Sequence, residues 1–209
     1  MGLIRFGIDY IRKPLFTVAY FLFVSFSMLI VFRYRIYPFV ENFAVTPFIF
    51  LVLLFIFNFF VYFFARRFLK KPEEFIAKSP NEFSARMDYN YLISKPFDIL
   101  TQQIFMVIFL SILVSLGFNL AEIILISVLI FALMHVPLLA SVGRFWGIFY
   151  TVAGIFSALI FPILILKVHY GFVYSYIIHW LFYTLSALFF WIRYGGLKHE
   201  ESSNQFSKI

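Results

Sequence analysis

The sequence of 209 residues contains no cysteine and few charged residues, which make up 13% of the chain. The lack of cysteine excludes disulfide bonds, thiolate metal sites and cysteine nucleophiles, so catalysis would have to use other side chains. The scarcity of charge argues against a soluble domain, in which about a quarter of the residues are charged. A chain that is 63% hydrophobic also has too few polar residues to cover the surface of a water-soluble fold.

Long apolar stretches are abundant instead, and the mean hydropathy is +0.95. Six stretches each approach the roughly 20 residues that an α-helix needs to cross the hydrocarbon of a bilayer. They cover residues 15–32, 43–64, 98–117, 121–140, 147–166 and 172–192. The sequence therefore predicts an all-α polytopic membrane protein, a bundle of about six transmembrane helices.

The 17 basic residues are distributed unevenly between these stretches. If the N-terminus is cytoplasmic, 14 of them fall in cytoplasmic segments, and Arg33, Arg35 and Lys167 fall outside. Because Lys and Arg accumulate in cytoplasmic loops, this division predicts two cytoplasmic termini in the cell (inner) membrane. The positions expected inside are 65–97, Arg144 and the tail, and those expected outside are Glu41, Asn119 and His169.

The net charge of +7 follows from the same distribution. The basic residues flank apolar stretches instead of forming a separate basic domain, so membrane lipids with anionic headgroups are the expected partners and nucleic acid is not. The long connection at 65–97 divides the chain. The predicted parts are a transmembrane helix pair at 1–64, a cytoplasmic or interfacial linker at 65–97, a four-helix core at 98–193 and a cytoplasmic tail at 194–209. The linker fits either interfacial helices broken near Pro80 or a solvated loop.

Polar side chains inside the apolar stretches are the candidate functional residues, because they are costly in hydrocarbon. They are Asp98, Gln102, Gln103, Glu122, His135, His179 and Tyr183. Three pairs are spaced four residues apart and so share a helix face: Asp98 with Gln102, Phe131 with His135, and His179 with Tyr183. Three helices are thus expected to direct polar groups at one cavity.

Each of these residues also has a purely structural interpretation. Asp98 follows Pro96 and is expected in a first helical turn, where a carboxylate is favoured by the helix dipole. Gln102 and Gln103 are expected to bond neighbouring helices, and a single histidine is often a packing residue. Two histidines on separate core helices favour a shared site over independent packing roles.

Three of the stretches carry their polar residues in a fixed order: Gln102-Gln103, then Phe131-Ala-Leu-Met-His135, then His179. This order resembles the CPBP family, also called Abi, of CAAX prenyl proteases and bacteriocin-processing intramembrane endopeptidases. The family's motifs are Glu-Glu-x-x-x-Arg, Phe-x-x-x-His and His-x-x-x-Asn, each on a helix. Separations of 33 residues between Gln102 and His135, and 44 between His135 and His179, lie in the family's usual range. The resemblance covers about residues 95–195.

The chain departs from the family at the residues that the chemistry requires. Both glutamates are replaced by Gln102 and Gln103, the arginine by Val107 and the asparagine by Tyr183. The resemblance implies that a glutamate and the second-motif histidine activate water, while the third-motif histidine and asparagine stabilise the oxyanion. A carboxamide cannot act as a general base, and losing that role typically costs about 10²- to 10⁴-fold in rate. We therefore expect low or absent peptidase activity.

Three hypotheses follow. The first is a catalytically impaired CPBP homologue, a pseudoprotease whose His-lined cavity binds a prenylated or membrane-embedded peptide or protein. The second is an active intramembrane endopeptidase in which Asp98 replaces the glutamate as base. The third, a small transporter or structural membrane subunit, predicts no convergence of the histidines. No cofactor or metal is expected, because two histidines without a third ligand fall short of a usual zinc site.

Overall fold

The structure is a computed structural model, and it describes residues 13–40, 45–78 and 86–198. These ranges form eight helices, and within them no strand longer than the isolated bridge between Leu69 and Leu197 is present. The helices are α1 (Pro14–Val31), α2 (Arg33–Val40), α3 (Val45–Phe68), α4 (Glu73–Ala77), α5 (Tyr89–Ser115), α6 (Leu120–Ser141), α7 (Arg144–Lys167) and α8 (Gly171–Gly195).

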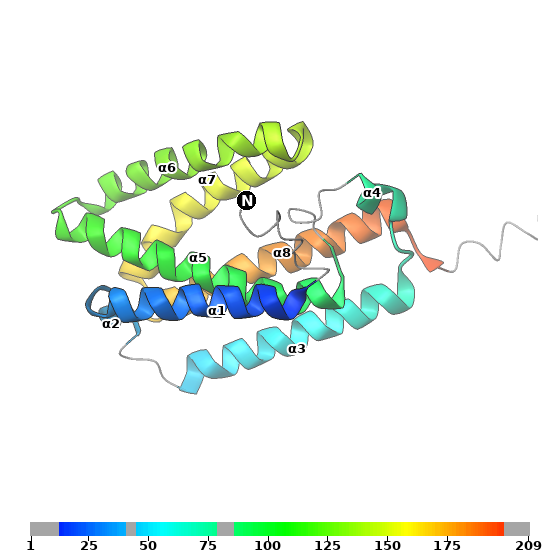
Figure 1. Ribbon diagram of the computed structural model, residues 1–209, viewed down its shortest axis with the longest axis horizontal. Helices are drawn as coiled ribbons and strands as arrows, with labels where there is room; N and C mark the ends of the chain where they lie inside the picture. Colours follow the sequence, from blue (N-terminus) through cyan, green and yellow to red (C-terminus); the bar gives the residue numbers. More distant parts are fainter. Residues whose placement is uncertain (1–12, 41–44, 79–85, 199–209) are drawn as a thin grey trace, which may run out of the picture.

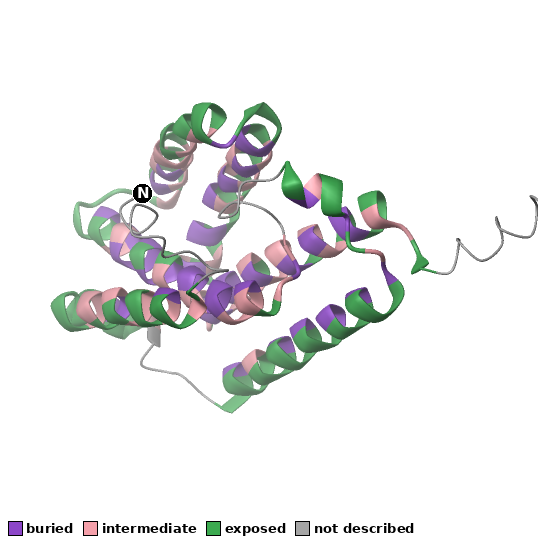
Figure 2. Ribbon diagram, turned by 45° about the vertical axis from the view of Figure 1, so that its right-hand side comes forward, coloured by how far each residue is buried: buried purple, intermediate pink, exposed green. Residues whose placement is uncertain are grey.

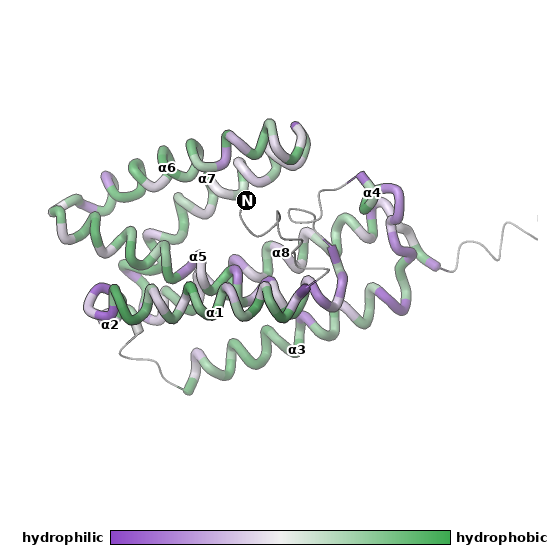
Figure 3. Tube along the Cα trace, viewed as in Figure 1, coloured by the Kyte–Doolittle hydropathy of each residue, from purple (hydrophilic) through white to green (hydrophobic). Residues whose placement is uncertain are grey.

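Six of the helices are long and apolar enough to cross a membrane, namely α1, α3, α5, α6, α7 and α8. They lie with their long axes broadly aligned and alternate in direction along the chain (Figure 1). Apolar residues dominate along these helices, whereas hydrophilic residues gather at α2 and around α4, at opposite ends of the bundle (Figure 3). The predicted all-α membrane bundle is therefore confirmed.

The outward faces of the bundle are apolar. Only 11% of the most apolar window of α1, and the same share of α6, is buried inside the protein. Exposed residues run along the outer sides of the helices, and buried residues face inward (Figure 2). Leaving such large side chains as Phe23, Phe60 and Leu133 in water would be unfavourable, so the bilayer is the solvent in which this arrangement is stable.

Several element boundaries differ from the prediction. α3 continues to Phe68 and α5 begins at Tyr89, so the connection between them is shorter than the expected linker at 65–97. Pro96 lies inside α5 instead of near its start, and Asp98 is therefore not in a first helical turn. The expectation that Asp98 serves the helix dipole at the membrane surface is wrong.

The short helices also refine the connections. α2 occupies the segment that holds Arg33 and Arg35, and its Ile36 is buried against the core around α5. α4 supplies one short helix in the linker, while Pro80 and Glu41 lie outside the described residues. At the start of α6, the side chain of Asn119 caps the helix and that of Glu122 bonds the Asn119 backbone N–H, which accounts for Glu122.

α5 is the central helix, with buried residues along most of its length. It packs against α1, α2 and α8, while α6 packs mainly against α7. Polar side chains join some of these pairs: Ser25 of α1 bonds Thr101 of α5 at 2.8 Å, and Asn58 of α3 bonds Thr184 of α8. The looser side of the bundle, between α5 and the α6–α7 pair, holds the cavity described next.

Candidate functional site

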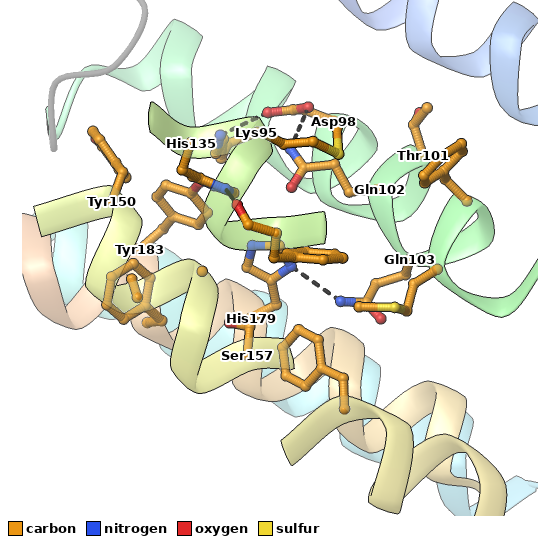
Figure 4. A pocket seen from close by; sticks show the side chains of 18 of the residues that line it. Lys95, Asp98, Thr101, Gln102, Gln103, His135, Tyr150, Ser157, His179 and Tyr183 are labelled. Atoms are coloured by element: carbon orange, nitrogen blue, oxygen red, sulfur yellow. Dashed lines mark hydrogen bonds and ion pairs between the residues drawn. The ribbon is translucent and has the colours of Figure 1, made fainter. Parts of the chain in front are cut away.

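A cavity of about 620 Å³ lies among α1, α5, α6, α7 and α8. The labelled side chains of α5, α6, α7 and α8 point into it (Figure 4). The sequence-predicted residues that line it are Asp98, Gln102, Gln103, Phe131, His135, His179 and Tyr183. Val107 does not line it; this residue is fully buried in the hydrophobic core beside the cavity. Val107, singled out in the sequence analysis, thus has no access to the site.

The α5 wall of the cavity carries a buried ion pair. Lys95 Nζ lies 2.6 Å from Asp98 Oδ2, and the two residues are each 6% exposed. Gln102 Nε2 donates to the other carboxylate oxygen, Oδ1, at 2.8 Å. The three residues share one helix face because they are spaced three and four apart. Both oxygens of Asp98 are thereby engaged within α5.

Lys95 is further held by the opposite wall. Its Nζ lies 3.9 Å from the ring centroid of Tyr183, a distance at which an ammonium ion is attracted to the electron-rich ring face. The expected linker at 65–97 included Lys95, whereas in the structure Lys95 lies within α5 and is buried. Tyr183 of α8 thus covers this cation.

Gln103 connects α5 to α8. Its Oε1 accepts a hydrogen bond from Ser175 Oγ at 2.9 Å, and its Nε2 lies 3.0 Å from His179 Nδ1. With the amide in this orientation Nε2 donates, so His179 Nδ1 carries the lone pair and the ring proton is on Nε2. His179 is also stacked on Tyr183, with ring centroids 5.4 Å apart. Gln103 therefore sets both the orientation and the tautomer of His179.

His135 is fixed by different contacts. Its Nδ1 lies 2.7 Å from the backbone oxygen of Phe131, which can only accept, so Nδ1 carries a proton; in the neutral ring Nε2 then carries the lone pair. The ring lies against Gly154 of α7, where a Cβ atom would come within 2.9 Å of His135 Cε1. The two histidines thus offer complementary groups to the cavity: a hydrogen-bond acceptor on His135 and a donor on His179.

The start of α5 determines how far Gln102 and Gln103 lie from the end of the bundle. With a helix beginning near residue 98, Gln102 would lie much closer to the inner surface than His179. Because α5 begins at Tyr89, Gln103 lies 14 residues into the helix, or about 21 Å. His179 lies 16 residues before the end of α8, or about 24 Å. The two residues therefore reach similar depths, and Gln103, not Gln102, bonds His179.

The residues of the site that sequence reasoning missed include Lys95, Ser175 and Gly154. Two of them had a detectable signal, since Lys95 precedes Asp98 by three residues and Ser175 precedes His179 by four, which places each pair on one helix face. The role of Gly154 depends on the approach of α6 to α7 and has no signal in sequence spacing. Within residues 13–40, 45–78 and 86–198, no three His, Asp or Glu side chains gather to hold a metal ion.

Comparison with known proteins adds no family to this geometry. No protein-family model, curated protein or solved structure matches the chain. The membrane bundle of six candidate spanning helices and its polar cavity therefore carry the functional argument.

Proposed function

We propose that this chain is an integral membrane binding protein, related to the CPBP endopeptidases but without their peptidase activity. Its cavity binds a membrane-associated peptide or protein segment, prenylated or embedded in the bilayer. The mostly apolar lining, which carries a smaller number of polar groups, supports this class of ligand. Phe131 and Phe161 contact apolar groups, and His135 and His179 offer one acceptor and one donor for a backbone amide or carboxylate.

The main support for this proposal is that Gln103 forms hydrogen bonds with both Ser175 and His179. An amide in this place positions a histidine but cannot remove a proton from water. Among the described lining residues, Asp98 is the one carboxylate, and its two oxygens accept from Lys95 and Gln102. The site is thus built for hydrogen bonding without a carboxylate aimed at His135.

The same contacts bear on the other hypotheses. An endopeptidase that uses Asp98 as its base would need that carboxylate directed at a water molecule beside His135, and its bonds to Lys95 and Gln102 oppose this. A transporter or structural subunit predicts unrelated positions for the histidines. The presence of His135 and His179 on one cavity favours the binding role.

Binding is tested with the purified full-length protein and a fluorescent prenylated peptide ending in a CAAX sequence. We expect saturable binding that weakens about five- to tenfold in His135→Ala and in His179→Ala, because each variant removes a ligand hydrogen bond of about 1 to 1.5 kcal/mol. His169→Ala is the matched control, since His169 is exposed between α7 and α8 and does not line the cavity. Its affinity should equal that of the parent.

Activity is measured on the same peptide and on a library of membrane peptides. The parent is expected to cleave none of them. Gln103→Glu and Gln102→Glu are the informative variants, because each restores a glutamate that the resemblance expects. Val107→Arg is not used, since it would bury a cation in the core. Cleavage by the parent that disappears in both Asp98→Asn and His135→Ala would refute the binding proposal in favour of an active peptidase. Equal peptide affinity in the parent and both histidine variants would refute the cavity as its site.

A further inference from the structure

A second hollow, of about 930 Å³, lies at the end of the bundle where α3 and α8 finish and α7 begins. This end holds α4, on the right in Figure 1. Four cations line the hollow: Lys70, Lys71 and Lys78 from the segment around α4, and Arg144 from the first turn of α7. Glu73 and Glu74 line it too, so the formal charge of the lining is +2. In the described part of the chain, no ion pair neutralises Lys71, Lys78 or Arg144.

The walls of this hollow are held by packing, although its cations are on the surface. Phe75 of α4 stacks on Tyr194 of α8, with ring centroids 4.5 Å apart. Its ring centroid also lies 5.6 Å from that of Trp146 of α7. The backbone N–H of Lys70 donates to the Gly196 oxygen at 3.0 Å. A Cβ atom on Gly195 would lie only 2.0 Å from the Lys70 oxygen. Three elements thus keep the basic segment at a fixed distance from Arg144.

The hollow lies at the ends of helices that are long and apolar enough to span a membrane, which is where lipid headgroups are expected. It is formed at the ends of the spanning helices α3, α7 and α8, and Trp146 and Tyr194 line it. Amphipathic aromatic residues of this kind are enriched at membrane–water interfaces. The first turn of α7 has no side-chain cap at Gly143, so its backbone N–H groups add to the positive potential of the cations.

We propose that this hollow binds the phosphate of an anionic phospholipid headgroup, with Lys71, Lys78 and Arg144 as its ligands. The excess of positive charge selects an anionic over a zwitterionic headgroup. Glu73 and Glu74 provide acceptors for the hydroxyl groups of a glycerol headgroup beside the phosphate. The acyl chains remain in the surrounding bilayer. This inference does not depend on the function proposed for the cavity among α5, α6, α7 and α8.

The test uses full-length protein in a neutral detergent and native mass spectrometry with added phosphatidylglycerol or phosphatidylcholine. We expect tighter binding of phosphatidylglycerol. In the double variant Lys71→Gln/Arg144→Gln its affinity should fall about 25-fold, since each basic residue near an anionic headgroup contributes about fivefold. The matched control is Lys13→Gln/Arg67→Gln, which removes two exposed cations that do not line the hollow. It should change the affinity less than about twofold.

Further measurements separate a specific site from its alternatives. Melting temperatures without lipid check that the double variant is folded; should it unfold, the single variant Lys78→Gln is expected to lose about fivefold. Arg144→Lys should retain most of the affinity. Equal losses in the double variant and the control would reduce the effect to diffuse surface charge and overturn the proposal. Equal affinity for phosphatidylcholine would also overturn it, as would equally tight binding of inorganic phosphate, which would identify a free anion as the ligand.

Discussion

Lys95 and Asp98 form an ion pair inside a helix that is long and apolar enough to span a membrane. Transfer of either charge alone out of water costs several kcal/mol, so neither is tolerated there without its partner. The pair is completed by Gln102 on one side and by the ring of Tyr183 on the other. These contacts join α5 to α8 and fix one wall of the cavity.

Replacing one partner should therefore be worse than replacing both. Lys95→Met leaves the Asp98 carboxylate without its cation and is expected to destabilise the protein by about 3 to 5 kcal/mol. Lys95→Met/Asp98→Leu removes both charges and should recover most of this loss. Thermal unfolding of the two variants and the parent in one detergent measures the difference. A double variant no more stable than Lys95→Met would show that the ion pair is not the source of the effect.

At the residue scale, the sequence predicts which residues line the cavity but not which of them bond to one another. The cost of polar groups in hydrocarbon and the four-residue spacing identified His135, His179 and Gln103 as cavity residues. The bond of Gln103 to His179 depends on the relative depth of α5 and α8, which spacing within one helix cannot determine. Whether the site has lost catalysis stays a prediction, because activity is a property of the reaction and not of the fold.

At the scale of the helices, the α6–α7 pair depends on close contact between two backbones. An added Cβ atom on Gly147 would lie 2.6 Å from the Cα atom of Leu139 and 2.8 Å from its backbone nitrogen. At Gly154, by contrast, the nearest atoms belong to the ring of His135. Small residues let membrane helices approach in this way, and the two glycines test backbone and side-chain contact separately.

Gly147→Ala and Gly154→Ala are each expected to lower stability by about 1 to 3 kcal/mol through overpacking. His135→Ala should rescue Gly154→Ala, because it removes the obstructing ring. Leu139→Ala should not rescue Gly147→Ala, since the backbone atoms of residue 139 remain in place. Unfolding of the four single and two double variants in detergent measures both outcomes. Rescue of Gly147→Ala by Leu139→Ala would contradict the backbone contact.

The six spanning helices were predictable because long apolar stretches have few alternatives. The start of α5 was not, since Pro96 favoured a helix beginning beside it, whereas the helix begins at Tyr89 and includes the proline. α2 was also missed, because Arg33, Tyr34 and Arg35 give its sequence the composition of a loop. Its helical form is stabilised instead by burial of Ile36, a tertiary contact.

At the scale of the whole molecule, the alternation of helix directions places α4 and the connection between α7 and α8 at opposite ends of the bundle (Figure 1), and this connection contains His169. The distribution of Lys and Arg predicts that α4 lies in the cytoplasm. Lys78→Cys and His169→Cys introduce single exposed thiols into a chain without cysteine. In intact cells an impermeant maleimide should label position 169 and leave position 78 unlabelled until the membrane is opened. The reverse pattern would invert the topology.

α6 forms one wall of the cavity, yet it packs mainly against α7 and contacts α5 at few positions. Its outer face is apolar, with Leu125, Leu129 and Leu133 exposed. Acyl chains press on this face from outside, so the lateral pressure of the bilayer opposes any outward movement of the wall. The capacity of the cavity is therefore a joint property of the protein and its lipid, and it should increase when thick, ordered membranes are exchanged for thin, fluid ones.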